Sequence, residues 1–441
     1  MEGGACGGWG VEGGAWSASA TTLETECHVP RSQVIIDNWT AIKGKFYLPV
    51  LALVPERNSF LVVSTLTLAA ASTMEPPAVR WGIIGLGDVT AVKSGPPFWK
   101  CRGSELVAVF RRTPGAAHKW AKAYAPSGCT GYENIDDFLA HPGLDAIYIA
   151  TPPGGHLETA LKVAAAGKHC YVEKPVGRSG RETAAIVSAF EAKGLTLFTA
   201  YVSRAYERTD AVRALLAEGA IGDRVTSVTY TLRGQGGARG MEGAALPWRL
   251  DAAQSGGGLV MDVGCHVIDR IDYLLGPLSG VTGSASNRNS PNQQVEDYVE
   301  VRATIGPSVS AAVASMGAPV ACTWEFAPRE DGAAPVDELL ICGPNGSLQM
   351  AAMSPDAPVT VLDADGAVVR RMSFDAPEHA AQRLIQSATD ELRGVRGVKC
   401  RSRAENALRA SRVLDVALGG YYGGREDDYW SRPDTWPGRK L

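Results

Sequence analysis

The sequence has 441 residues, more than one hydrophobic core usually supports, so we expect two domains together with extra segments. With 45% hydrophobic and 20% charged residues the composition is typical of a soluble globular protein, and a formal net charge of -4 excludes a basic surface for nucleic acid. Nine cysteines without a C-x-x-C pair argue against a disulfide framework and for reduced thiols in the cytoplasm, and no apolar run is long enough to span a membrane.

Residues 1–73 differ in composition from the rest of the chain. The segment begins rich in glycine and serine, and acids such as Glu2, Glu12 and Glu24 oppose both a transit peptide and a secretory signal. We interpret it as a disordered leader or as an extension of the gene model, because Met74 lies five residues before the first core strand.

From Val79 the pattern alternates short apolar runs with amphipathic helices, which predicts a doubly wound parallel sheet, a Rossmann domain, over residues 74–204. Ser179 and Glu182 form a predicted capping box for one of its helices. We expect strands at 79–84, 106–110, 144–150, 169–172 and 195–201, and helices at 116–124, 157–167 and 179–194. The ligand crevice of such a fold lies beyond the carboxyl ends of the strands.

The pattern changes after about residue 205 and predicts an α+β domain with a mostly antiparallel open sheet over residues 205–418. A glycine-rich loop at 234–243 is interpreted as a lid, and the last helix as capped by Ser402 with Glu405. We expect helices at 210–218 and 258–275, a strand at 225–232, β-rich segments at 280–372, and two closing helices. The tail 419–441 has no predicted structure.

The stretch Val79–Thr90 combines a buried strand with a glycine-rich turn. Gly85 and Gly87 allow a tight turn and the close approach of backbone to a pyrophosphate, while a following helix would turn its positive end toward the phosphates. Thr90 occupies the third position of the G-x-G-x-x-G pattern, where a smaller residue is usual. By itself the stretch leaves a dinucleotide site and a purely structural turn as alternatives.

Two further strand ends are predicted to reach the crevice. The turn at 151–156, Thr-Pro-Pro-Gly-Gly-His, is rigid enough to face a ligand, although strand-to-helix turns look like this without one. Glu173 and Lys174 end a core strand, and Pro175 biases Lys174 toward an extended backbone that projects it into the crevice. The alternative for Lys174 is a solvated strand end.

A predicted helix carries Asp262 and His266 on one face, four residues apart, with Asp269 a turn further. A histidine that titrates near neutral pH suits removal of a hydroxyl proton during oxidation of an alcohol. A neighbouring lysine would stabilise the developing charge, and an aspartate would orient the reacting groups. A surface ion pair is the alternative for Asp262 and His266, and we interpret Cys265 between them as a packing residue.

Together these motifs resemble the Gfo/Idh/MocA family of nicotinamide-dependent oxidoreductases, over about residues 79–418. The motifs are Gly-Ile-Ile-Gly-Leu-Gly at 82–87, Ala-Thr-Pro-Pro-x-x-His at 150–156, Glu-Lys-Pro at 173–175, and Gly-Gly-Gly-Leu-x-x-Asp-x-Gly-x-His-x-x-Asp at 256–269. Four motifs in family order make this resemblance specific.

The resemblance implies a catalytic set of Lys174, Asp262 and His266, with His266 as the proton acceptor. It also implies a homodimer or higher oligomer built on the second domain. The residues that it implies around the cofactor are Gly85, Gly87, Asp88, Val89, Thr151, Pro152, His156, Glu173 and Lys174. No metal site is predicted.

The second strand bears on the choice of cofactor. A site that selects NAD places an acid at the end of this strand, whereas arginine there favours the 2′-phosphate of NADP. Here the strand ends in Arg111 and Arg112, and Glu105 lies at its opposite end. We therefore predict NADP, with NAD as the alternative if the arginines are merely solvated.

Positions that resemble the family's substrate contacts are Arg204, Trp248 and Arg249. Arg249 would bind a carboxylate or a sugar hydroxyl, or else tie the two domains together. The predicted function is an NADP-dependent dehydrogenase or reductase that acts on a small molecule such as a sugar, polyol or cyclic diol. The alternatives are a redox-assisted, NAD-dependent glycosidase and a non-catalytic, cofactor-sensing regulator, which the presence of Lys174, Asp262 and His266 disfavours.

Overall fold

The computed structural model describes residues 75–235, 246–290, 293–308, 312–327 and 332–439, together with three short strands before them. The chain divides into two compact units, Met1–Glu75 and Pro76–Leu441. In the first unit, β1 (Thr40–Ile42), β2 (Lys45–Pro49) and β3 (Thr65–Leu68) form an antiparallel sheet. The rest of residues 1–73 lies outside the described residues, so the interpretation of this segment stays a prediction.

The first sheet of the second unit has six parallel strands in the order β6-β5-β4-β7-β8-β9. Its strands are β4 (Val79–Ile84), β5 (Ser104–Phe110), β6 (Thr130–Tyr132), β7 (Ala146–Ile149), β8 (His169–Val172) and β9 (Leu197–Thr199). Trp81 and Ile83 on β4 are fully buried, as expected for a central strand covered on both faces. The order and direction of the strands confirm the predicted doubly wound sheet.

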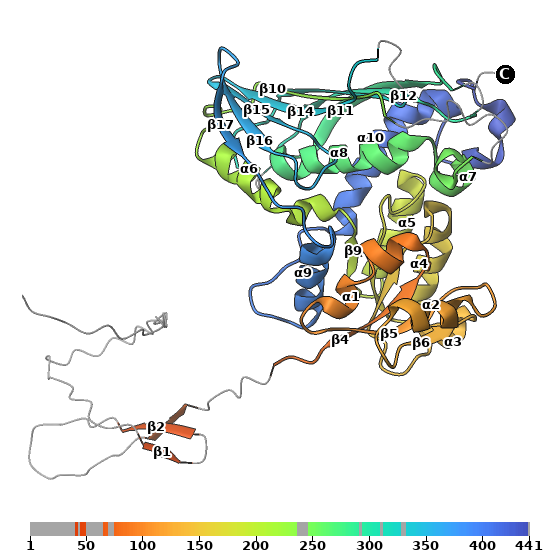
Figure 1. Ribbon diagram of the computed structural model, residues 1–441, viewed down its shortest axis with the longest axis vertical. Helices are drawn as coiled ribbons and strands as arrows, with labels where there is room; N and C mark the ends of the chain where they lie inside the picture. The colour runs from red at the N-terminus through yellow and green to blue at the C-terminus, as the bar shows by residue number, and fades with distance from the viewer. Residues whose placement is uncertain are drawn as a thin grey trace, which may run out of the picture. The chain divides into compact units, whose positions relative to one another are not determined.

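Helices cover both faces of this sheet (Figure 1). They are α1 (Pro97–Lys100), α2 (Ala116–Tyr124), α3 (Ile135–Leu139), α4 (His156–Ala165) and α5 (Gly180–Glu191). The predicted cap of α5 is confirmed, because the Ser179 hydroxyl accepts the backbone N–H of Glu182. The Glu182 carboxylate turns back to accept the backbone N–H of Arg178 at 2.8 Å, so a second free donor before the helix is satisfied.

The second sheet has eight strands in the order β11-β12-β13-β10-β14-β15-β16-β17. Only β10 and β13 run parallel to each other among these described strands, which confirms a mostly antiparallel sheet. The strands are β10 (Ser227–Arg233), β11 (Leu278–Ser286), β12 (Tyr298–Ile305), β13 (Pro319–Glu325), β14 (Val336–Gly343), β15 (Gly346–Met350), β16 (Val359–Asp363) and β17 (Val368–Met372). The proposed lid at 234–243 lies mostly outside the described residues.

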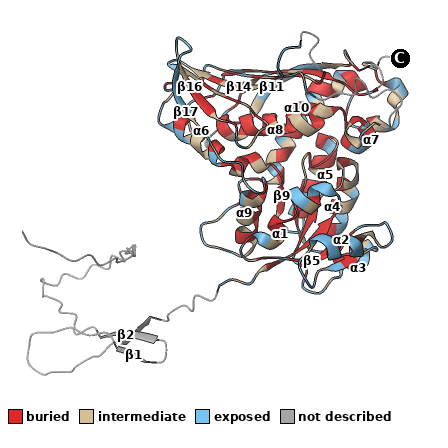
Figure 2. Cartoon of the chain, in the orientation of Figure 1, coloured by how far each residue is buried: buried red, intermediate tan, exposed pale blue. Residues whose placement is uncertain are grey.

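The helices of this second part connect the two sheets. α6, α8 and α10 lie beneath the eight-stranded sheet, where buried residues concentrate on the facing surfaces (Figures 1 and 2). α10 also packs against α5, so the two cores are continuous. The helices are α6 (Glu207–Ala217), α7 (Ala252–Ser255), α8 (Leu259–Leu275), α9 (Gln382–Leu392) and α10 (Ala404–Tyr422).

Two details of the closing helices differ from the prediction. α9 lies beside α1, where its Leu384 and Ile385 join the buried cluster of Trp81, so this late segment completes the first core. The predicted cap of α10 is wrong, because Arg403 occupies the N-cap and the buried Ser402 hydroxyl has no partner in the described residues. No helix in the described ranges is long and apolar enough to cross a membrane.

Candidate active site

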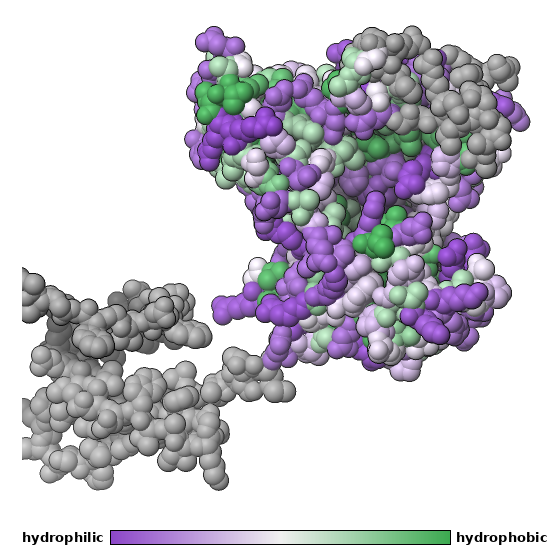
Figure 3. Space-filling view, viewed as in Figure 1, coloured by the Kyte–Doolittle hydropathy of each residue, from purple (hydrophilic) through white to green (hydrophobic). Residues whose placement is uncertain are grey.

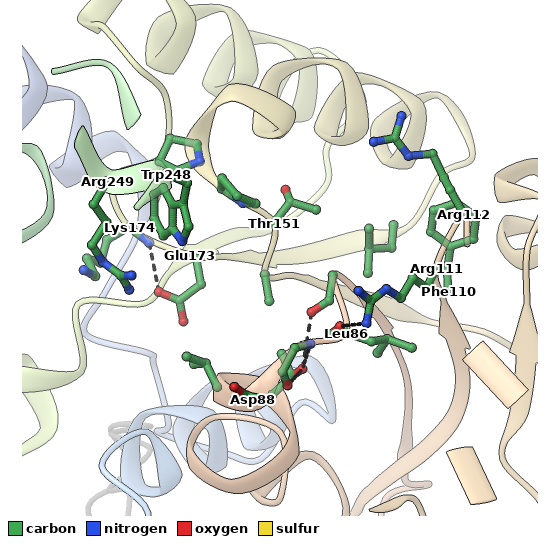
Figure 4. Close-up of a pocket in the computed structure, with 18 of the residues that line it drawn as sticks. Leu86, Asp88, Phe110, Arg111, Arg112, Thr151, Glu173, Lys174, Trp248 and Arg249 are labelled. Atoms are coloured by element: carbon green, nitrogen blue, oxygen red, sulfur yellow. Dashed lines mark hydrogen bonds between the residues drawn. The ribbon is translucent and has the colours of Figure 1, made fainter. Parts of the chain in front are cut away.

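A cleft of about 650 Å³ opens at the carboxyl ends of β4, β5, β7 and β8. In the space-filling view hydrophilic residues gather in the hollow between the regions that carry the two sheets (Figure 3). Arg111 and Arg112 lie at one end of the cleft, and Lys174, Trp248 and Arg249 lie at the other (Figure 4). The lining also contains Gly85, Leu86, Gly87, Asp88, Val89, Phe110, Thr113, Thr151, Pro152, Pro153, Glu173 and Asp262.

The glycine turn forms the floor of the cleft between these ends. Gly85 has φ +96°, and a Cβ there would lie 2.6 Å from the backbone nitrogen of Thr151, so only glycine fits. A Cβ at Gly87 would meet nothing within 4 Å, which leaves the backbone open to a ligand. The buried Thr90 hydroxyl accepts the N–H of Gly87 at 2.9 Å and so holds the turn in shape.

The helix that was expected directly after the glycine turn does not form as predicted. Instead of a long α-helix, the chain forms one π-helical turn at Val89–Lys93 and then the four-residue α1. A Cβ at Gly95 would lie 1.8 Å from the Thr90 carbonyl oxygen, so the chain turns sharply between the two. A turn this short contributes little dipole, so phosphate binding here would depend on individual backbone and side-chain donors.

The second strand ends at the outer end of the cleft. Arg111 donates from Nη1 to the carbonyl oxygen of Leu86 at 2.8 Å, which ties the strand end to the glycine turn. Arg112 and Thr113 are exposed and line the same space. Sequence reasoning missed Thr113, although its position directly after the two arginines could have indicated it.

The turn after β7 contributes Thr151 and Pro152 to the cleft wall, but it does not place His156 there. His156 is fully buried, and its ring nitrogens face the carbonyl oxygens of Thr151 at 2.7 Å and Pro175 at 3.1 Å. Its predicted contact with the cofactor is therefore corrected. His156 links the turn after β7 to the turn after β8 from behind the cleft.

The turn after β8 carries Glu173 and Lys174 into the inner end of the cleft. The Tyr148 hydroxyl lies 2.7 Å from a carboxylate oxygen of Glu173. Lys174 Nζ contacts the Asp262 carboxylate and donates to the Asp262 carbonyl oxygen at 3.1 Å. The other Asp262 oxygen accepts from Arg249 Nε at 2.8 Å. The structure thus brings together a lysine and an aspartate 88 positions apart in the chain.

Neighbouring charges determine the ionisation of Asp262 and Lys174. Burial opposes ionisation of Asp262, but Lys174 and Arg249 outweigh burial and hold its pKa well below the ordinary value. Burial likewise opposes the charge on Lys174, yet Asp262 raises the pKa of Lys174 above its ordinary value. Both side chains therefore stay ionised near neutral pH, and Lys174 presents a fixed positive charge at the inner end of the cleft.

His266 lies one turn further along α8 and does not line the cleft as the lysine and aspartate do. Its ring packs edge-on against Tyr201, with centroids 5.9 Å apart, and it makes no hydrogen bond within the described residues. Burial first, and then the charge of Lys174, lower its pKa well below 6.5, so the imidazole is neutral at neutral pH. The expectation of a pKa near neutrality is corrected accordingly.

Arg204, expected near the substrate, is instead a buried structural residue. Its guanidinium pairs with the carboxylate of Asp269 through both Nε and Nη2, at 2.9 and 2.7 Å, and neither side chain reaches the cleft. Trp248 and Arg249 do line the cleft, with the Arg249 guanidinium 4.4 Å above the Trp248 ring. Position in the sequence alone could not show that Trp248 and Arg249 line the cleft whereas Arg204 does not.

Comparisons with known proteins now decide the family. A family model described as an oxidoreductase family with an NAD-binding Rossmann fold matches residues 79–201, and a Gfo/Idh/MocA C-terminal domain matches residues 209–349. The chain belongs to the Gfo/Idh/MocA family. This Gfo/Idh/MocA protein is therefore an oxidoreductase with an NAD-binding Rossmann domain.

Oxidoreductase P35 of Formosa agariphila is 27% identical to this family member over 342 residues, which are 77% of this chain and 98% of that protein. The trans-1,2-dihydrobenzene-1,2-diol dehydrogenase of Mus musculus is 30% identical over 205 residues, 45% of this chain and 57% of that protein. Its match is therefore confined to about half of each chain.

Solved structures share the fold of this Gfo/Idh/MocA protein. A 3-ketoreductase from Actinomadura kijaniata, in complex with NADP and TDP-benzene, has a TM-score of 0.62 at 21% identity and covers 78% of this chain and 98% of that one. A levoglucosan dehydrogenase in complex with NADH and levoglucosan has a TM-score of 0.61 at 22% identity and covers 77% and 96%.

The cleft of this family member fits a nicotinamide dinucleotide. Open space at Gly87 admits a pyrophosphate against the backbone, Arg111 and Arg112 offer cations at the end expected for the adenosine half, and Lys174 lies at the far end. Gly85, Gly87, Thr151 and Pro152 would hold the cofactor by backbone and surface contacts.

The tail of this Gfo/Idh/MocA protein, which the sequence left unplaced, forms a C-terminal strap (residues 423–439) over two segments next to the site. The buried Arg425 guanidinium donates to the carbonyl oxygens of Gly256 at 2.7 Å and Arg178 at 2.6 Å. The Tyr429 hydroxyl donates to the same Gly256 oxygen at 2.5 Å, and the Trp430 ring lies 3.6 Å beneath the Arg178 guanidinium.

The positions of these contacts explain what the strap does. Arg178 follows Lys174 by four residues, and Gly256 lies three residues before α8, the helix of Asp262. Gly256 has φ +85°, and a Cβ there would lie 2.6 Å from the Arg178 carbonyl oxygen. Only glycine at this position therefore lets the two segments lie so close together. The strap therefore fixes the turn that carries Lys174 against the helix that carries Asp262.

Proposed function

We propose that this protein is an NADP-dependent dehydrogenase or reductase that acts on an alcohol or carbonyl carbon of a sugar, polyol or cyclic diol. The observation that carries the proposal is the ion pair of Lys174 and Asp262 at the inner end of the dinucleotide cleft. The names of relatives support the substrate class, since one is a diol dehydrogenase and one a levoglucosan dehydrogenase.

The proposed mechanism assigns one task to each of three side chains. A bound nicotinamide supplies the hydride acceptor. The Lys174 ammonium stabilises negative charge on the substrate oxygen as its proton leaves, and in the reverse direction it polarises the carbonyl. His266, neutral because of its lowered pKa, accepts the hydroxyl proton. Asp262 orients Lys174 and also holds Arg249 beside it at the inner end of the cleft.

We propose NADP rather than NAD because two cations and no carboxylate line the cleft at the end of β5. Calorimetry should therefore show tighter binding of NADP⁺ than of NAD⁺. Arg112→Ala is expected to weaken NADP⁺ binding by about 10- to 100-fold, the usual effect of losing one charge-assisted hydrogen bond, and to leave NAD⁺ binding unchanged. The exposed Lys122→Ala serves as a control, and tighter binding of NAD⁺ by the natural protein would overturn the preference.

The substrate class is tested by following absorbance at 340 nm across a panel of sugars, polyols and cyclic diols with each cofactor. A steady change with any of these compounds, faster with NADP⁺, is the expected result. Product formation without net change of the cofactor would instead indicate the redox-assisted glycosidase. Tight cofactor binding without any turnover would indicate the cofactor-sensing regulator and would contradict the proposed activity.

A further inference from the structure

The C-terminal strap lies outside both stretches that the family models match, which end at residues 201 and 349. In Figure 1 it is the dark blue segment near the C-terminus, and it contacts α7. Its central side chains are buried, since Arg425 is 2% exposed and Tyr429 is fully enclosed. A charged side chain is seldom buried this deeply unless partners fix it, so the contacts of Arg425 show what the strap holds.

The Arg425 guanidinium joins three parts of the chain. Nε donates to the Asp415 carboxylate of α10 at 2.8 Å, which balances the charge of the arginine. Nη1 donates to the carbonyl oxygen of Gly256 at 2.7 Å, and Nη2 donates to that of Arg178 at 2.6 Å. Because a guanidinium is planar and rigid, it fixes the spacing of the two carbonyl groups that it joins.

The Tyr429 hydroxyl repeats this link from a second point of the strap. It donates to the Gly256 oxygen at 2.5 Å and lies 3.1 Å from the Arg178 oxygen. The indole nitrogen of Trp436 donates to the carbonyl oxygen of Tyr429 at 2.8 Å, so the strap holds Tyr429 in place. Two side chains of the strap therefore converge on the same pair of carbonyl groups.

The segment before α8 needs this support because residues 256–258 are three consecutive glycines. Glycine has the largest backbone freedom of any residue, so the run by itself would not set the position of α8. A Cβ at Gly256 would lie 2.6 Å from the Arg178 carbonyl oxygen, and one at Gly258 would lie 2.2 Å from the Glu296 carbonyl oxygen. Close packing thus requires glycine here, and contacts from other segments must supply the rigidity.

A buried carboxylate supports the far end of the glycine run. Glu296 is 1% exposed, accepts the backbone N–H of Gly258 at 2.8 Å, and also accepts the Tyr422 hydroxyl of α10. Asp262 follows Gly258 by four residues and lies in the first turn of α8. The start of α8 is therefore fixed, and the strap sets its position against the turn that carries Lys174.

We propose that Arg425 and Tyr429 are positioning residues for the reaction, which hold Lys174 and Asp262 in contact at the inner end of the cleft. The inference rests on the proposed function, in which the Lys174 ammonium stabilises charge on the substrate oxygen. The two joined carbonyl groups lie four and six positions in the chain from the members of this ion pair. A displacement of about 1 Å between reacting groups can lower a rate by about 100-fold. Neither strap residue lines the cleft, so both act through other groups.

Two substitutions in the strap test this role with the compound that the natural protein turns over fastest. Tyr429→Phe removes the hydroxyl and keeps the buried ring, whereas Arg425→Gln removes the bridge between the carbonyl groups. We expect kcat to fall by about 3- to 10-fold in Tyr429→Phe and by about 10- to 100-fold in Arg425→Gln. The dissociation constant of the cofactor should stay unchanged, because no strap residue lines the cleft.

The matched controls are Arg432→Gln and Tyr124→Phe. Arg432 pairs with Asp427 at 3.0 Å inside the strap, and Tyr124 is exposed on α2. Both controls should keep the kcat of the natural protein. Thermal melting of all four variants shows how much stability each has lost.

A double-mutant cycle with Lys174→Ala separates positioning from a general loss of stability. If the strap acts through the Lys174 ammonium, adding Tyr429→Phe to Lys174→Ala should leave the residual kcat unchanged. A destabilised protein would instead lose kcat by the same factor in both backgrounds, with a lower Tm and a smaller fraction of cofactor-binding molecules.

The outcomes separate this inference from the proposed function. Natural kcat in both strap variants would overturn the inference and leave the dehydrogenase in place. Equal losses from Tyr429→Phe with and without Lys174 would make the strap a purely structural element and would also overturn it. If Arg425→Gln does not fold, the cycle with Tyr429→Phe decides alone. Absence of turnover by the natural protein with every compound of the panel would contradict the proposed function itself, and this inference with it.

Discussion

Replacing Lys174 with alanine is expected to lower kcat for alcohol oxidation by about 10²- to 10³-fold, the usual loss when one donor to developing oxygen charge is removed. The ammonium lies at the inner end of the cleft, and Asp262 holds it in position. Cofactor binding is expected to change little, because the glycine turn and the arginine end of the cleft stay intact. Steady-state kinetics and calorimetry on the same preparation measure both quantities.

A matched control for this variant is Lys162→Ala, which removes an ammonium from the exposed face of α4. Lys162 pairs with the exposed Glu158 at 2.9 Å, and such surface pairs contribute little. We expect natural kcat for the control. If Lys174→Ala also kept the kcat of the natural protein, the Lys174 ammonium would have no part in the mechanism. A loss of cofactor binding equal to the loss of kcat would instead assign Lys174 to cofactor binding.

His266→Ala is expected to lower kcat by about 10²- to 10⁴-fold, the usual contribution of a positioned proton acceptor. Dissociation constants of the cofactor should stay near the natural values, since His266 lies outside the lining of the cleft. The exposed His118→Ala should leave kcat unchanged and so controls for loss of a histidine elsewhere. Full activity of His266→Ala would mean that another group takes the proton.

The pH dependence of catalysis follows from the imidazole of His266. Burial and Lys174 lower the pKa of His266 well below 6.5, so the neutral, proton-accepting form persists above that pKa. We expect kcat/KM for oxidation to stay level down through pH 6.5 and to fall only as pH drops through the lowered pKa. In Lys174→Met the repulsion is gone, so the acidic fall of the residual activity should move to higher pH.

Much of the site was visible in local sequence patterns. The glycine turn at Gly85 and the lysine after β8 each follow a buried strand, and parallel strands end at one edge of a sheet. Asp262 and His266 share a helix face through spacing alone. Such motifs can be recognised in a sequence because the residues that form each motif lie within a few positions of one another.

Other outcomes depended on which segments pack together, which the spacing of residues does not show. Arg204 and Arg249 are both arginines near predicted ligand positions, yet one pairs with the buried Asp269 and the other with Asp262 in the cleft. His156 looked like a ligand contact, but its ring nitrogens face the carbonyl oxygen of Thr151 in its own turn and that of Pro175 in the turn after β8. Spacing says nothing about which surfaces meet after folding.

By itself the sequence determined the alternation of strands and helices, the doubly wound sheet, the second open sheet and the residues at the strand ends, because periodicity and turn chemistry act over short distances. Only the tertiary structure decided that a C-terminal strap anchored by Arg425 joins the Lys174 turn to α8, and that Arg204 pairs with the buried Asp269. These features depend on contacts between segments up to 247 positions apart, which form only when the two sheets and their shared helices pack together.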